Sequence, residues 1–150
     1  MSIWGPGPFE NDDAADWFAD LMERPGLTRI SEALDEVVDP THAGYIDVGS
    51  GCEAIAAAAV LGELLLPAPD DPELEDDGAV VLRAEWEAEA PLVRQRLLRQ
   101  AEAALELVLN DEEHSEVRQI VEEFGEFFAE WTEILKNLQN RLRAAVLPTP

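Results

Sequence analysis

An alanine-rich segment near the middle of the chain has the sequence Ser50-Gly-Cys-Glu-Ala-Ile-Ala-Ala-Ala-Ala-Val-Leu-Gly-Glu-Leu-Leu-Leu66. Its four consecutive alanines, with Ile, Val and Leu around them, leave almost no polar face, which is typical of a helix surrounded by other helices. Ser50 and Glu53 have the spacing of a capping box, in which each side chain bonds the other residue's amide. Pro67 ends the segment, because proline cannot continue a helix. We therefore expect a buried central helix over residues 51–66.

Apolar residues recur at helical spacing on both sides of this segment. Asn11 is a favourable N-cap for a first helix, and a second is expected over residues 28–38. Further helices are expected over 79–87 and 91–109, where Pro91 suits the first helical position. An amphipathic stripe of up to thirty residues then covers 117–146, and Gly125 within it leaves one kinked helix or two as alternatives.

These elements predict an all-α protein. No run alternates apolar and polar residues for long enough to predict a strand. A chain of 150 residues is long enough for one hydrophobic core. We expect a single compact domain of five to six helices over residues 1–150. Within it we expect an irregular Gly/Pro segment over 1–10, an exposed and mobile acidic loop over 67–78, and a tail over 148–150.

The charge of the chain limits its partners. It has 33 acidic and 10 basic residues, a net charge of −23, although 47% of its residues are hydrophobic. This apolar content excludes a disordered acidic tail. Repulsion argues against binding nucleic acid or an anionic membrane, so the composition favours a basic protein partner or no charged partner. Residues 1–82 hold 19 acidic and 2 basic residues, so most of the charge, −17, lies in the first half.

Several bulk features favour a cytoplasmic protein. Cys52 is the only cysteine, so no intramolecular disulfide is possible. The first residues lack the basic and apolar regions of a signal peptide. The longest apolar run, residues 54–66, is shorter than the roughly 20 residues that a membrane-spanning helix needs.

One motif suggests a cofactor. The segment Tyr45-Ile-Asp-Val-Gly-Ser-Gly-Cys52 is similar to the glycine-rich motif of Rossmann-like methyltransferases. That motif requires a strand, a tight turn and a helix within a parallel sheet. Glu53 stands where the last glycine is expected, and no further strand follows. A turn and a capped helix explain the same residues, so methyltransferase-like binding at 47–53 is a remote alternative, and we predict no cofactor.

A cluster of oxygen-bearing side chains opens the first helix: Asn11, Asp12, Asp13 and Asp16. Hard cations such as magnesium and calcium prefer such ligands, so an enzyme or metal-dependent site here is an alternative function. The spacing is not that of an EF-hand. N-capping and compensation of the helix dipole explain the same residues, and we predict no metal site.

The reactive side chains do not form a catalytic set. His42 and His114 each lack the i, i+4 histidine partner of a metalloprotease helix. Cys52 could gain a lower pKa near a helix N-terminus, but Glu53 beside it opposes ionisation. We therefore expect a buried structural thiol rather than a nucleophile, and no catalytic residues.

The N-terminal residues Ile3-Trp-Gly-Pro-Gly-Pro-Phe-Glu-Asn-Asp-Asp-Ala-Ala-Asp-Trp-Phe-Ala-Asp-Leu21 resemble a family of small bacterial proteins, domain of unknown function 4259. Members begin W-G-x-G-P-F-x-N-D-x-A-x-D-[FW], and the matching positions are Trp4, Gly5, Gly7, Pro8, Phe9, Asn11, Asp12, Ala14, Asp16 and Trp17. The likeness continues at residues 44–46, 53–60, 103–109, 115–117 and Trp131. The resemblance implies no activity, because none is known for the family.

The chemistry of this opening motif predicts a structural clasp. Its glycines and prolines fix an irregular segment that we expect to fold back over the helices. Trp4 and Phe9 are expected to anchor the segment in the core. Asn11 and Asp12 are expected to tie it to the start of the first helix.

For function, we expect a non-catalytic interaction module that binds a basic protein, as an immunity protein or antitoxin does. Opposite charge accelerates such association. Six carboxylates of the acidic loop have no evident structural role and are the predicted partner-binding residues: Asp70, Asp71, Glu73, Glu75, Asp76 and Asp77. The other interpretation of the charge is that it only maintains solubility.

Overall fold

The protein is all-helical in the computed structural model, which describes residues 3–39 and 44–147. These residues form α1 (Asp12–Glu23), α2 (Leu27–Val38), α3 (Val48–Leu64), a 3₁₀ turn η2 (Pro72–Leu74), α4 (Asp77–Ala88), α5 (Pro91–Asn110), α6 (Glu116–Phe124) and α7 (Phe128–Ala145). The described part of the chain contains no β-strand, only isolated bridges between Ile3 and Asn11 and between Ile46 and Ser115. The predicted fold class is therefore confirmed.

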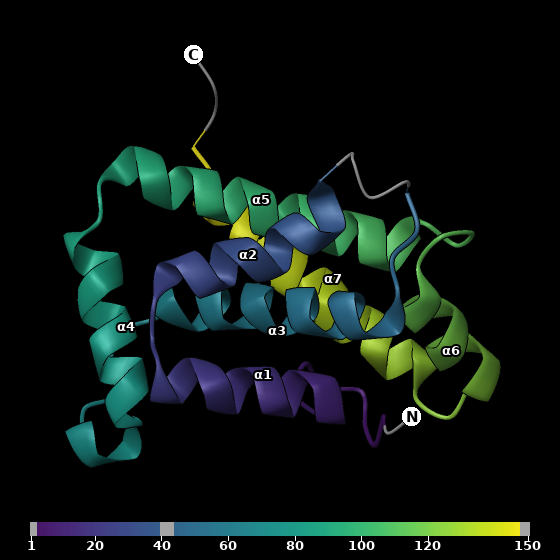
Figure 1. Cartoon of the computed structure of the whole chain (residues 1–150), viewed down its shortest axis with the longest axis horizontal. Coiled ribbons are helices and arrows are strands. Elements are labelled where there is room, and N and C mark those ends of the chain that lie inside the picture. The colour runs from purple at the N-terminus through teal and green to yellow at the C-terminus, as the bar shows by residue number, and fades with distance from the viewer. Residues whose placement is uncertain (1–2, 40–43, 148–150) are drawn as a thin grey trace.

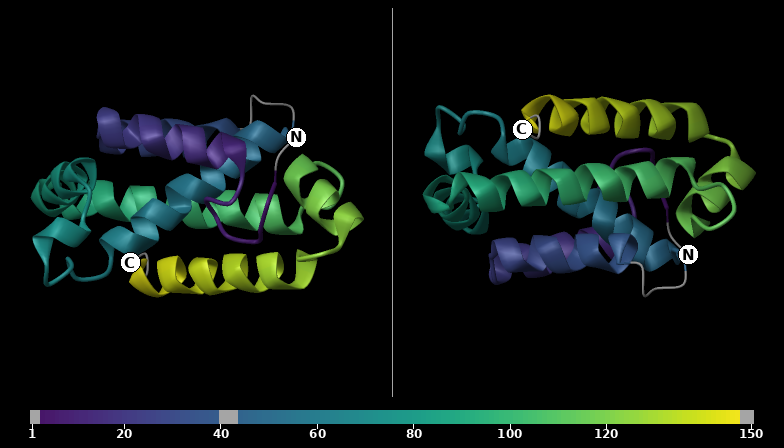
Figure 2. Two further views of the ribbon diagram at one scale, coloured as in Figure 1. Left: turned by 90° about the horizontal axis from the view of Figure 1, so that it is seen from below. Right: turned by 90° about the horizontal axis from the view of Figure 1, so that it is seen from above.

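Helix α3 lies at the centre of the molecule (Figure 1). It contacts α1, α2, α5, α6 and α7, so that five other helices surround it. Figure 2 shows α3 crossing between the pair α1 and α2 on one side and α7 on the other. Residues 54–58 are at most 3% exposed, and one buried apolar cluster joins them to residues of the surrounding helices. The expected central helix is confirmed.

Small residues allow the other helices to approach α3 closely. A Cβ atom on Gly51 would lie 2.9 Å from Cγ1 of Val117 in α6. A Cβ atom on Gly62 would lie 2.8 Å from Cδ1 of Leu138 in α7. Both distances are shorter than ordinary carbon contacts, so these two glycines set how near α6 and α7 pack.

The start of α3 differs from the prediction. Its N-cap is Asp47, whose Oδ1 accepts a hydrogen bond of 2.9 Å from the amide of Ser50. Ser50 also donates its hydroxyl to Oδ2 of Asp47 at 3.0 Å. The predicted capping box of Ser50 and Glu53 is wrong, because an aspartate three residues earlier already satisfies the free amides of the first turn.

The amphipathic stripe over 117–146 forms two helices rather than one. Gly125 adopts a left-handed conformation with φ 69°, which ends α6, and its amide donates to Val121 O at 3.0 Å. Glycine reaches this conformation without the steric cost that other residues carry. This break is why the described residues hold seven α-helices instead of the expected five to six.

A polar junction joins the segment before α3 to the start of α6. The amide of Ile46 donates to His114 O at 2.8 Å, and the amide of Glu116 donates to Ile46 O at 2.9 Å. The Glu116 carboxylate then accepts from the amide of Val48 at 2.9 Å and from the hydroxyl of Tyr45. The hydrogen bond to Glu116 raises the pKa of Tyr45. Both sides of this junction belong to segments that carry the family resemblance.

Helices α4 and α6 lie at opposite ends of the molecule (Figures 1 and 2). Among the residues that the structure describes, no helix combines the length and the apolar character needed to cross a membrane. The predicted tail over 148–150 lies outside the described residues.

Candidate partner-binding groove

A groove of about 410 Å³ lies where α4 meets the ends of α1 and α3. Phe18 and Met22 of α1, Leu64 of α3 and Leu82 of α4 contribute to its apolar wall. Phe9 of the N-terminal segment also lines it, with its ring centroid 4.9 Å from that of Phe18. We call this hollow the α4 groove.

The loop between α3 and α4 adds exposed leucines to the α4 groove. Leu66 is 42% exposed and Leu74 is 76% exposed, and both line the groove. Apolar side chains that stay exposed beside an apolar hollow are typical of surfaces that bind another molecule. Neither leucine was among the predicted binding residues, although the position of Leu74 between Glu73 and Glu75 was a signal for it.

The same loop is held in place by specific polar contacts. Arg83 of α4 donates Nε to Oε1 of Glu75 at 3.0 Å and Nη1 to Leu66 O at 2.9 Å. Asp71 Oδ1 accepts from the amide of Glu73 at 3.0 Å, and Asp76 caps α4 by accepting from the amide of Gly78 at 3.0 Å. Contacts within the protein therefore fix the wall of the groove without a partner.

Three of the six predicted binding carboxylates thus have structural roles that the sequence did not reveal: Asp71, Glu75 and Asp76. The expectation of exposure is wrong for Glu75, whose side chain is 11% exposed and pairs with Arg83, which is 14% exposed. The other five are exposed: Asp70, Asp71, Glu73, Asp76 and Asp77. They stand on the loop and the first turn of α4, beside the exposed leucines.

The electrostatic character of the α4 groove is negative. Glu63, Glu75 and Asp76 line it together with one cation, Arg83. Arg83 is neutralised by its ion pair with Glu75, so the remaining carboxylates are not balanced from within the groove. An apolar hollow with a negative rim matches a partner segment that has apolar side chains flanked by lysine or arginine.

The N-terminal motif folds as a clasp, with one correction. Asn11 is buried, and its Oδ1 caps α1 by accepting from the amide of Ala14 at 2.8 Å. Phe9 packs against the core as expected. Trp4 does not, because it is 58% exposed and its indole Nε1 donates to Oδ1 of Asp12 at 3.1 Å. The indole N–H requires a hydrogen-bond acceptor, and Asp12 offers one at the surface.

The carboxylates of α1 do not assemble as metal ligands. Asp12, Asp13 and Asp16 are exposed, and the amide oxygen of Asn11 is occupied by the helix cap. Nowhere in residues 3–39 and 44–147 do three or more His, Cys, Asp or Glu side chains gather as metal ligands would. The structure places these four residues at the start of α1, where Asn11 caps the helix and Asp12 also accepts the hydrogen bond from Trp4.

The glycine-rich segment 45–52 is not placed as a cofactor loop. Gly49 and Gly51 lie within α3, and Ile46 forms a single bridge instead of a strand. The described residues supply no parallel sheet on which a Rossmann-like site would be built. Gly51 is explained by its close approach to Val117.

Cys52 and His114 are the other reactive side chains that the structure describes. Cys52 is 2% exposed, and burial, with smaller contributions from nearby carboxylates, raises its pKa to about 12. A thiol with this pKa is protonated at neutral pH and is a poor nucleophile. His114 Nδ1 lies 2.9 Å from Oδ1 of Asp111 in the turn after α5, and its side chain is about half exposed. His42 lies outside the described residues.

Comparison with known proteins agrees with the motif. No curated protein and no solved structure matches the chain. A family model described as Domain of unknown function (DUF4259) matches residues 2–134, which include the clasp, the central helix, the α4 groove and the first part of α7. The chain belongs to this family of unknown function.

Proposed function

We propose that the protein is a non-catalytic binding module that holds a basic protein in the α4 groove, in the manner of an antitoxin or immunity protein. The observation that carries the proposal is the position of the apolar hollow. It lies against the loop that holds most of the predicted partner-binding carboxylates. A basic segment could place an apolar side chain between Leu66 and Leu74 while its lysines or arginines meet the exposed aspartates.

The alternative of a catalytic or metal-dependent site on Asn11, Asp12, Asp13 and Asp16 has less support. The amide of Asn11 caps α1, and one carboxylate oxygen of Asp12 holds the indole of Trp4. A binding role requires no group beyond those that line the α4 groove.

The experiment that tests this function compares two exposed leucines. Leu74 is 76% exposed in the α4 groove, and Leu92 is 71% exposed at the start of α5. Neither Leu74→Ser nor Leu92→Ser should affect folding much, because each side chain is mainly solvated. Each variant and the native protein are immobilised and exposed at low salt to a lysate of the source cells, and the retained proteins are identified by mass spectrometry.

The expected result is a basic protein that the native chain and the control Leu92→Ser retain and that Leu74→Ser loses. Its retention should fall as salt is raised, because screening weakens attraction between opposite charges. Equal retention of the same basic proteins by both serine variants would contradict binding in the α4 groove. Retention of no basic protein by the native chain would contradict the function itself.

The charge contribution is tested by a second matched pair. Asp70→Asn, Asp71→Asn and Glu73→Gln together remove three exposed charges of the acidic loop. Glu123→Gln, Glu130→Gln and Glu133→Gln remove three exposed charges from α6 and α7. Both variants have the same net charge, so a difference between them in association rate with the captured protein reports position. We expect the loop variant to associate more slowly, and equal rates would mean that only the overall charge acts.

A further inference from the structure

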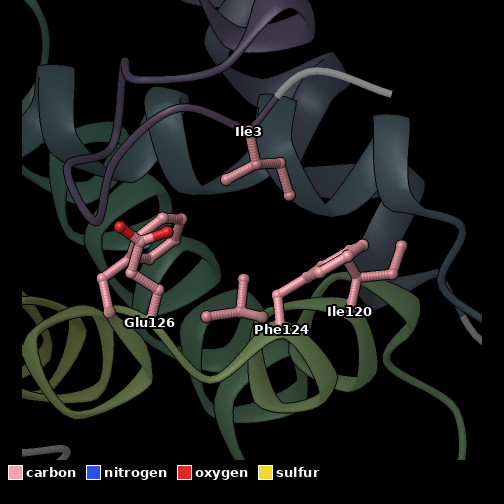
Figure 3. Close-up of a pocket in the computed structure, with 6 residues that line it drawn as sticks. Ile3, Ile120, Phe124 and Glu126 are labelled. Atoms are coloured by element: carbon pink, nitrogen blue, oxygen red, sulfur yellow. The ribbon is translucent and has the colours of Figure 1, made fainter.

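A second apolar pocket lies between the N-terminal segment and the break after α6 (Figure 3). Its volume is about 280 Å³, close to the lower limit for sites that bind small molecules. Figure 3 shows Ile3 on one side and Ile120 and Phe124 of α6 on the other, with the carboxylate of Glu126 at one end. Val121 and Phe127 complete the lining.

The turn at Gly125 creates this pocket. Its left-handed conformation ends α6, and two residues that line the pocket stand on either side of it, Phe124 and Glu126. Phe124 is 74% exposed, although it belongs to the apolar stripe of the sequence. A phenyl ring held at the surface beside a hollow remains available to a ligand.

The charge in the pocket is a single unpaired carboxylate. Among the residues that the structure describes, Glu126 is the only ionisable one that lines it. Within the described part of the chain, the Glu126 carboxylate accepts no hydrogen bond and forms no ion pair. Arg118, the only cation of α6, does not neutralise it, because Arg118 pairs with Glu112 at 3.2 Å and Glu122 at 3.5 Å.

We infer that this pocket binds a small primary amine with an apolar body, whose ammonium group pairs with Glu126 and whose body lies among Ile3, Ile120 and Phe124. The apolar lining favours burial of a hydrocarbon or aromatic group. The phenyl rings of Phe124 and Phe127 add attraction for a cation. A carboxylic acid of the same shape would be repelled by Glu126.

The test uses three molecules with one apolar body and different charges: 2-phenylethylammonium, 2-phenylethanol and 3-phenylpropionate. Each is titrated at constant ionic strength into the ¹⁵N-labelled full chain, and amide shifts are followed by NMR. We expect the amine to shift the amides of Gly125 and Glu126 with a Kd roughly fivefold below that of the alcohol, the factor expected for one exposed ion pair. The acid should bind more weakly than both.

Two variants separate the carboxylate of the pocket from the general negative charge. Glu126→Gln should give the amine and the alcohol the same Kd. Glu87→Gln, at an exposed position on α4 at the other end of the molecule, should keep the preference for the amine. The inference is overturned if the preference survives Glu126→Gln, if the amine shifts amides elsewhere but not at Gly125 and Glu126, or if no amide shifts.

Discussion

Helix α3 and the corner formed by the acidic loop and α4 use their residues in opposite ways. α3 is surrounded by five helices, and its middle residues are alanines that are almost completely buried. The α4 corner leaves Leu66 and Leu74 exposed and surrounds them with carboxylates. The residues of α3 therefore contribute mainly to the stability of the fold. The α4 corner, in contrast, keeps exposed apolar and charged groups that the fold does not need. A binding surface can vary there without loss of the core.

The largest difference is expected between two leucines of these regions. Leu61 of α3 is fully buried, and Leu61→Ala should lower the free energy of unfolding by about 3 kcal/mol, through lost burial and the cavity left behind. Leu74→Ala should lower it by less than about 0.5 kcal/mol, because the side chain is 76% exposed. Urea denaturation of both variants measures the difference, and similar losses would mean that the loop is part of the core.

The joint between α1 and α4 is the next most sensitive point. A Cβ atom on Gly78 would lie 2.3 Å from the backbone oxygen of Met22, which cannot move without displacing α1. Gly78→Ala should therefore cost about 2 kcal/mol of stability and distort the α4 groove. The control is Gly26→Ala, where a Cβ atom would meet nothing within 4 Å and the change should stay below about 1 kcal/mol. Thermal unfolding compares the two, and an equal shift in Tm would contradict the close contact.

The ion pair that holds the acidic loop should have an intermediate effect. Arg83→Ala leaves the carboxylate of Glu75, 11% exposed, without its cation and also frees Leu66 O. We expect a loss of about 1–2 kcal/mol, since a poorly solvated charge loses its partner. Arg96→Ala, at an exposed position on α5, is the control for loss of one positive charge. Faster hydrogen exchange at residues 70–76 in Arg83→Ala alone would show that this pair fixes the wall of the groove, and unchanged exchange would show that it does not.

The sequence predicted α3 better than it predicted the α4 corner, for a physical reason. Four consecutive alanines between proline and capping signals admit only a buried helix, whatever surrounds them. Arg83 lies eight residues after Glu75, and the two side chains can pair only if α4 runs in the right direction relative to the loop. No local sequence pattern predicts that direction. The groove itself joins residues from α1, α3 and α4, so it became visible only in three dimensions.

The start of α3, the break after α6 and the position of Trp4 also differ from simple local expectation for physical reasons. Asp47 and Ser50 were both able to cap α3, and the hydrogen bond between Glu116 and the amide of Val48 favours the earlier start. Gly125 marked a break in the stripe, but two helices resulted because its φ is left-handed. Trp4 belongs to an apolar residue type, yet the hydrogen bond to Asp12 keeps it at the surface. The start of α3 and the position of Trp4 were therefore set by hydrogen-bond partners that no local pattern of the sequence identifies.

The smallest expected effect on stability concerns Glu53, an acidic residue in the first half of α3. Burial, followed by the nearby charges of Asp13, Glu36 and Asp47, raises the pKa of Glu53 above its ordinary value of 4.5. The folded protein therefore prefers the protonated carboxyl, and ionised Glu53 opposes folding at neutral pH. This unfavourable contribution shrinks as the pH falls through the raised pKa and disappears below the ordinary value of 4.5, where the carboxyl is protonated in both states.

Glu53→Gln imitates the protonated carboxyl and should raise the free energy of unfolding at pH 7 by less than about 1 kcal/mol. The advantage over the native chain should shrink as the pH falls through the raised pKa of Glu53 and vanish below the ordinary value of 4.5. Glu63→Gln removes the same charge from an exposed position on the same helix and serves as the control. Urea titrations from pH 4 to pH 7 measure both. If Glu53→Gln destabilises the protein at pH 7, the surroundings of α3 favour the charge, and the contrast with the α4 corner, where carboxylates are tolerated because they are solvated, does not extend to this residue.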